Sequence, residues 1–158
     1  MSKNTTYILR WSQDDQHEFT PEGQDDLSRW IDMLTINYHR DIKDGDGLAL
    51  IANQVLGNYQ ANNASIIRTD SLPATATTPA EHLAVAAFRT AELVEVAMTR
   101  FKLLDGLAAA VTYSRRTYGD DAVDQAMSWL QDHGAQMEQA LMQLDVPAEP
   151  VTAMSMAN

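Results

Sequence analysis

Acidic residues at helical spacing are the groups in this sequence best placed to do chemistry. Glu92 and Glu95 lie three residues apart, and Asp121 and Asp124 repeat that spacing further along the chain. Residues at i and i+3 share one face of a helix, where two carboxylates can chelate Mg²⁺. One hypothesis is therefore a divalent-metal site formed by these four residues.

The same four acids give residues 80–130 a resemblance to the all-α nucleotide pyrophosphohydrolases, whose paired acidic motifs on two helices hold magnesium. The resemblance implies a Mg²⁺-dependent nucleotide hydrolase as an alternative function. Helix capping and the helix dipole explain Asp121 and Asp124 without a metal, and Glu92 and Glu95 fall on a stripe that is solvated in any case. We therefore favour a protein with no catalytic residues, no metal and no cofactor.

Other motifs lack the partners that their chemistry needs. A calcium loop centred on the acidic and glycine residues 44–47 would place Ile42 and Asn53 at its first and last ligand positions, where acidic side chains are required. The four histidines have no metal-ligand spacing, and Arg115 and Arg116 fit the C-terminal end of a helix. These residues are better explained as structural than as a site.

Charge supplies the main functional clue. The 158 residues include 22 acids and 11 lysines or arginines, for a net charge of −11. Residues 120–158 carry seven acids and no lysine or arginine. Such a chain is a poor ligand for nucleic-acid backbones and anionic membranes, and suits a protein partner with a basic surface. The residues predicted to contact that partner are Asp120, Asp121, Asp124 and Asp132.

Hydrophobic periodicity predicts an all-α fold of about five helices in one compact domain over residues 1–146. Apolar residues recur at three- and four-residue steps in five segments. Asp46 is a candidate N-cap for the second segment, and Thr78 to Glu81 match a capping box at the start of the third. The predicted helices cover residues 20–43, 46–59, 79–105, 107–118 and 122–144.

Two short segments alternate between apolar and polar residues instead. Residues 5–11 and 65–71 have the period of a strand and could pair as one two-stranded ribbon. Residues 147–158, which contain Pro147 and Pro150, are expected to form a disordered tail. The sequence has no cysteine and no apolar run long enough for a membrane span, so we expect a cytoplasmic protein.

These observations favour a small acidic helical protein that acts by binding another macromolecule. The classes that fit are a regulator, an inhibitor or immunity-type protein, a chaperone, and a mimic of nucleic-acid charge. The wide apolar arc of the predicted helix 79–105 also indicates a homodimer, and a structural homodimer subunit is a further alternative.

Overall fold

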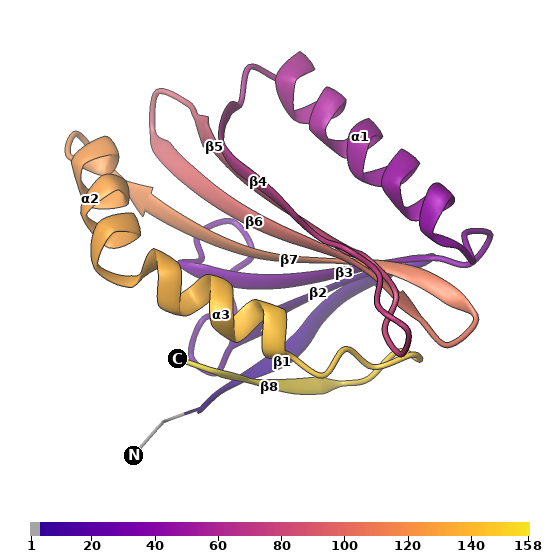
Figure 1. Ribbon diagram of the computed structural model, residues 1–158. Coiled ribbons are helices and arrows are strands. Elements are labelled where there is room, and N and C mark those ends of the chain that lie inside the picture. Colours follow the sequence, from indigo (N-terminus) through magenta and orange to yellow (C-terminus); the bar gives the residue numbers. More distant parts are fainter. Residues whose placement is uncertain (1–3) are drawn as a thin grey trace.

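The computed structural model describes residues 4–158, and its largest element is an antiparallel sheet of eight strands (Figure 1). The strands run across the sheet in the order β4-β5-β6-β7-β3-β2-β1-β8. Their bounds are β1 (Asn4–Gln13), β2 (Gln16–Pro21), β3 (Asp32–His39), β4 (Ser65–Leu72), β5 (Glu81–Arg89), β6 (Leu93–Leu104), β7 (Leu107–Tyr118) and β8 (Ala153–Ala157).

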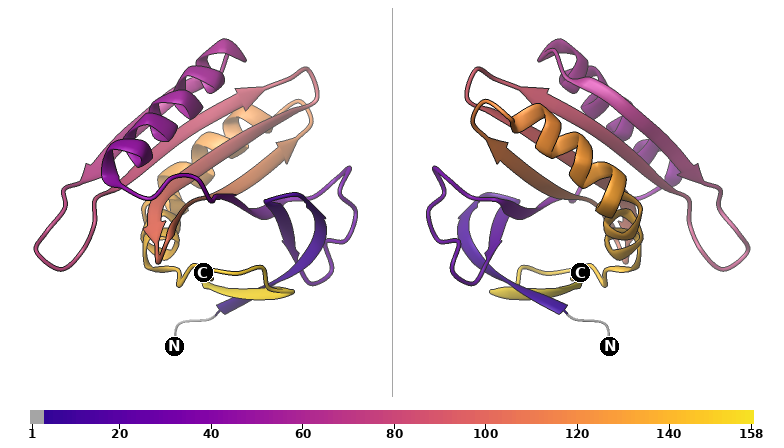
Figure 2. Two further views of the ribbon diagram at one scale, coloured as in Figure 1. Left: turned by 90° about the vertical axis from the view of Figure 1, so that its right-hand side faces the viewer. Right: turned by 90° about the vertical axis from the view of Figure 1, so that its left-hand side faces the viewer.

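Helices cover both faces of this sheet. Helix α1 (Gly45–Ala61) lies on one face, which we call the outer face. The other, inner face carries a helical segment made of α2 (Ala122–Trp129), a π-helical turn (Leu130–Gly134) and α3 (Ala135–Gln143). The sheet curves around this segment, so that β1 and β8 turn under α3 (Figure 2).

Each face has its own apolar core. The inner core contains large residues such as Leu34, Val96, Met98, Tyr113 and Leu141, which are all at most 2% exposed. The outer core is smaller and rich in alanine, and it is formed by Leu48, Ile51, Ala52, Ala84, Phe101, Ala108 and Ala110. The strands between the two helical layers are therefore buried on both faces.

The all-α prediction is wrong, and burial on both faces explains why. Segment 79–105 is not a helix but the pair of strands β5 and β6, and segment 107–118 is strand β7. In a strand covered on both faces, consecutive residues are apolar, and such a run cannot be told from a buried helix by periodicity. The apolar arc that indicated a homodimer is the centre of the sheet.

The start and kink signals of that predicted helix belong to loops. Thr78 hydrogen-bonds Thr75 through the two hydroxyls, at 2.6 Å, and so closes a turn rather than capping a helix. Gly106 has φ +85° and forms the tight turn between β6 and β7, a conformation that favours glycine. The predicted kink at residues 105–106 is therefore a hairpin turn.

Two of the predicted helices exist. Residues 46–59 lie within α1, although its N-cap is Asp44, whose carboxylate accepts the backbone N–H of Gly47 at 2.8 Å, and not Asp46. Residues 122–144 match the segment from α2 to α3, with Gly134 in the π-helical turn. The predicted helix 20–43 is instead the end of β2, a loop, and strand β3.

The two alternating segments are strands, but they do not pair with each other. Residues 5–11 lie in β1 and residues 65–71 in β4, at opposite sides of the sheet. The expected disordered tail contains β8, which pairs antiparallel with β1 from Asn4 opposite Ala157 to Ile8 opposite Ala153. No helix among residues 4–158 combines the length and apolarity needed to cross a membrane.

Candidate functional site

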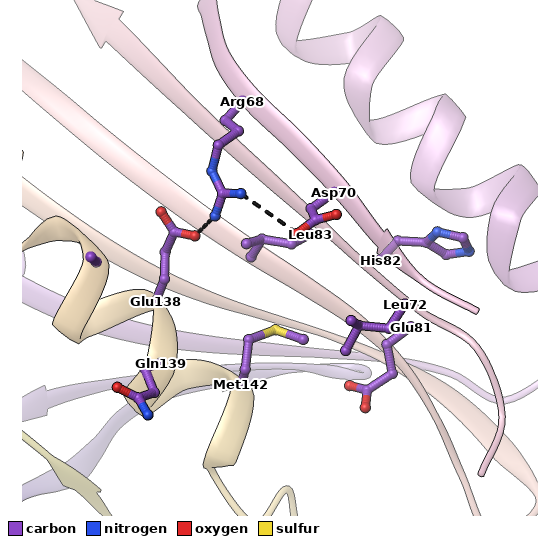
Figure 3. Close-up of a pocket in the computed structure, with 10 residues that line it drawn as sticks. Arg68, Asp70, Leu72, Glu81, His82, Leu83, Glu138, Gln139 and Met142 are labelled. Carbon is purple, nitrogen blue, oxygen red and sulfur yellow. Dashed lines mark ion pairs between the residues drawn. The ribbon is translucent and has the colours of Figure 1, made fainter. Parts of the chain in front are cut away.

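A cavity of about 450 Å³ opens on the inner face, between the edge of the sheet and helix α3 (Figure 3). We call it the edge groove. Its walls come from β4, from β5 and from α3, which the curvature of the sheet brings together. The residues lining it are Arg68, Asp70, Leu72, Glu81, His82, Leu83, Ala135, Glu138, Gln139 and Met142.

The strand alternation places the groove side chains. Arg68, Asp70 and Leu72 are every second residue of β4, so they point to the same face of the sheet. Opposite them, Glu138 and Met142 are four residues apart on α3 and share one face of that helix. The groove is apolar where Leu72, Leu83 and Met142 meet, and polar along its rim.

The rim of the groove is mostly acidic. Arg68 reaches from the strand across to the carboxylate of Glu138, and its other nitrogen lies 3.5 Å from Asp70 (Figure 3). About half of the Arg68 side chain is exposed to solvent. Ion pairs this exposed contribute little stability, so the bridge across the rim can open at small cost.

Strand β4 is an edge of the sheet. It pairs with β5 on one side, and seven of its eight residues are exposed. An edge strand has unpaired backbone N–H and C=O groups on its free side, and these can pair with the backbone of another chain. The groove therefore combines a free strand edge, an apolar cavity and acidic side chains.

Arg100 fixes α3 beside the groove. Its side chain is 3% exposed, and its guanidinium donates to the carbonyls of Leu141 and Leu144 at 3.1 and 2.9 Å. The same guanidinium donates to Glu81 through Nε at 2.6 Å. Those carbonyls lie at the C-terminal end of α3, where the helix dipole favours a positive charge. Arg100 thereby balances the charge of Glu81 and ties the end of α3 to β5 and β6.

The four acids predicted to contact a partner lie outside this groove. Asp120 and Asp121 form the turn between β7 and α2, Asp124 is in the first turn of α2, and Asp132 is in the π-helical turn. All four are exposed to solvent. Asp121 stands at the N-cap position of α2 but makes no side-chain cap hydrogen bond. They belong to the same acidic segment as Glu138, which does line the groove.

The four residues of the predicted metal site do not share helix faces as expected. Glu92 is exposed in the turn between β5 and β6, and Glu95 is in β6 and pairs with Arg116 at 2.8 Å. Only Asp121 and Asp124 are on or beside a helix. Among residues 4–158, no group of three or more His, Asp or Glu side chains is arranged to hold a metal.

Sequence patterns alone did not indicate the groove residues. Arg68, Leu72 and Met142 belong to segments far apart in the chain, and they meet only because the sheet curves toward α3. The alternation over 65–71 did predict a strand, but it assigned neither Arg68 nor Asp70 to a site. The missing signal was the pairing of that segment with β5.

Comparison with known proteins identifies the fold through structure alone. No protein-family model matches the sequence, and no curated protein is significantly similar to it. The crystal structure of the Ran-binding protein Mog1p from Saccharomyces cerevisiae superimposes with a TM-score of 0.57 at 10% identity, over 90% of this chain and 92% of that one. A mutant of protein Mog1 gives a TM-score of 0.50 at 9% identity, over 81% and 84% of the two chains. The chain has the β-sheet fold seen in the Mog1 structures.

Proposed function

We propose that the protein is a non-catalytic binding protein that takes an extended, basic segment of a protein partner along the edge groove. The observation that carries this proposal is the free β4 edge beside an apolar cavity with an acidic rim. An extended peptide can add to such an edge through backbone hydrogen bonds, while a pocket accepts one of its side chains.

Charge supports a basic segment. Asp70 and Glu138 stand on the groove rim, and the only lysine or arginine lining the groove, within the described part of the chain, is Arg68. The helical segment that forms one wall belongs to residues 120–158, which contain seven acids and no lysine or arginine. Such a field attracts a basic partner and speeds its association.

The fold gives this function a precedent. One structure of the same fold is described as a Ran-binding protein, so the fold is compatible with binding a protein. The absence of cysteine fits a partner met in the reducing cytoplasm.

A second copy of the chain is the competing occupant of the β4 edge, because two free edges can pair with each other. Light scattering distinguishes the homodimer from the monomer before any peptide is added.

A direct test uses a labelled peptide of alternating lysine and valine, read by fluorescence anisotropy. We expect it to bind the parent protein, and we expect the same peptide with glutamate in place of lysine not to bind. The double variant Asp70→Asn/Glu138→Gln should weaken binding of the lysine peptide by about tenfold, because it removes two rim charges and frees Arg68.

The matched control is Asp124→Asn/Asp132→Asn, which changes the net charge by the same amount outside the groove. It should retain at least half of the parent affinity. Equal weakening by the two double variants would mean that the peptide responds to overall charge and not to the groove. Equal binding of the lysine and glutamate peptides would also refute the proposal.

A further inference from the structure

A second cavity on the inner face has the buried side chain of Tyr7 in its wall. It measures about 330 Å³ and lies between strands β1, β3 and β7, the helical segment and β8. We call it the inner cavity. Its polar wall includes Tyr7, Asp32, Tyr113 and Arg115, and Trp129 and Met137 are among the apolar residues on the helical side. None of the residues that line it also lines the edge groove, so the two sites are separate.

The Asp32 carboxylate in the wall of the inner cavity is already satisfied. One carboxylate oxygen of Asp32 accepts the hydroxyl of Tyr113 at 2.5 Å and Nη1 of Arg115 at 3.0 Å. The other oxygen accepts the amide of Gln24 at 3.2 Å. Asp32 therefore has three donors and offers little to a ligand.

The Tyr7 hydroxyl and Nε of Arg115 are not among the donors to Asp32. Tyr7 is 2% exposed, and its side chain lines the cavity. The Nε–H of Arg115 is enclosed and lacks a hydrogen-bond partner among residues 4–158. A hydroxyl in a cavity wall can donate to a guest that supplies an oxygen acceptor, whereas the enclosed Nε of Arg115 is out of reach of a guest.

The electrostatics of the cavity favour an uncharged guest. Asp32 balances the charge of Arg115, and the whole protein carries −11. Burial, and then the negative charge of Asp32, raise the pKa of Tyr7. The field that opposes a negative charge on the Tyr7 oxygen also opposes an anionic ligand atom placed against it.

The aromatic side chains in the rest of the wall favour a flat aromatic guest. The Arg115 guanidinium lies 5.2 Å from the centre of the Trp129 ring, and Trp129 stacks on Tyr113 with ring centres 5.9 Å apart. Flat aromatic groups pack well against such a wall. We propose that the inner cavity binds a small uncharged aromatic carboxamide, whose carbonyl oxygen accepts from the Tyr7 hydroxyl.

The test compares benzamide with benzoate, which have nearly the same shape and differ in charge. Each is titrated into the ¹⁵N-labelled full chain and followed by NMR, with the indole N–H of Trp129 as the reporter. We expect benzamide to shift the Trp129 signal in a saturable way and benzoate to bind at least tenfold more weakly. A flat titration with benzamide, or equal affinities, would overturn the proposal.

Tyr7→Phe tests the assigned contact, because it removes the hydroxyl and keeps the ring. We expect benzamide to bind about tenfold more weakly, as for the loss of one hydrogen bond. Tyr59→Phe is the matched control, since that hydroxyl bonds Thr99 on the outer face, and it should leave benzamide affinity unchanged. Undiminished binding to Tyr7→Phe would also reject the assignment. The comparison of benzamide with benzoate uses the parent protein, so it tests the proposal even if Tyr7→Phe fails to fold.

Discussion

The two helical layers cover the same sheet in different ways. Helix α1 packs on the outer face against Ala84, Ala108 and Ala110, whose small side chains let the helix approach closely. The segment from α2 to α3 packs on large side chains, and its C-terminal end is held by the guanidinium of Arg100. The outer layer is held mainly by close apolar contact, with a hydroxyl bond from Tyr59 to Thr99, and the inner layer is held in part by the buried Arg100. Both proposed binding sites lie in the inner layer.

Removing the polar contact of the inner layer should have the largest effect. Arg100→Leu leaves Glu81 without its buried partner and the carbonyls of Leu141 and Leu144 without their donor. Breaking a buried ion pair in this way costs about 3–5 kcal/mol. Urea unfolding should show that loss of stability. Arg100→Leu/Glu81→Leu should recover part of it, and a loss below about 1 kcal/mol in the single variant would mean that apolar packing alone holds α3.

Enlarging one alanine should damage the outer layer next most strongly. Ala110 is 4% exposed and lies under α1, so Ala110→Leu forces the helix away from the sheet. Overpacking of this kind costs about 1–3 kcal/mol. Urea unfolding measures the loss, and Leu50→Ala, at a position on α1 that is 57% exposed, is the control. An unchanged midpoint for Ala110→Leu would show that α1 is loosely seated.

Buried tyrosines of the inner layer should make the protein sensitive to high pH. Burial, followed by the charge of Asp32, raises the pKa of both Tyr7 and Tyr113 above the ordinary 10.0. Their contribution to stability is therefore intact below about pH 10, and it falls as the pH rises further, because the unfolded chain then ionises first. Each contributes about 1.4 kcal/mol per pH unit to that fall.

Tyr7→Phe should make the loss of stability above pH 10 less steep by that amount. Chemical unfolding at pH 9, 10 and 11 measures the slope. The expected result is a difference from the parent that grows with pH. A slope identical to that of the parent would show that Tyr7 ionises freely in the folded protein.

Removing the aspartates at the helix N-termini should have the smallest effect on stability, and that effect should differ between the two layers. Asp44 caps α1 through the N–H of Gly47, whereas Asp121 makes no such bond to α2. Asp44→Ala should cost about 1 kcal/mol, the usual value for an N-cap, and Asp121→Ala a few tenths through the dipole alone. Thermal unfolding of both variants gives the comparison. Equal losses would contradict the capping difference.

Local signals predicted the helical layers better than the sheet. Residues 46–59 and 122–144 have an apolar stripe and a polar face, and each is a helix because one of its faces meets solvent. The residues from Glu81 to Tyr118 lack a solvent face, so their pattern does not distinguish helix from strand. Their arrangement depends on which strands pair, and strand pairing produces no periodic pattern along a single sequence.

The sequence predicts the acidic character of the candidate sites but not their position in the fold. The acidity of residues 120–158 is visible in the sequence, and Glu138 brings one of those acids to the edge groove. The groove itself needs β4 beside α3, and the inner cavity needs Tyr7 beside Arg115. Those contacts join distant segments and follow from the curvature of the sheet, which composition and spacing do not encode.

The junction between β3 and β7 has a consequence for how the chain folds. Strands β1 to β3 form one local meander and β4 to β7 another, and the two join through pairs such as Asp32 opposite Arg115. Each meander can assemble from neighbours in sequence, but the junction must close a long loop first, which slows folding. The inner cavity lies over that junction, since both Asp32 and Arg115 line it. The cavity therefore exists only after this long-range pairing has formed, and a guest bound there would hold the two halves of the sheet together.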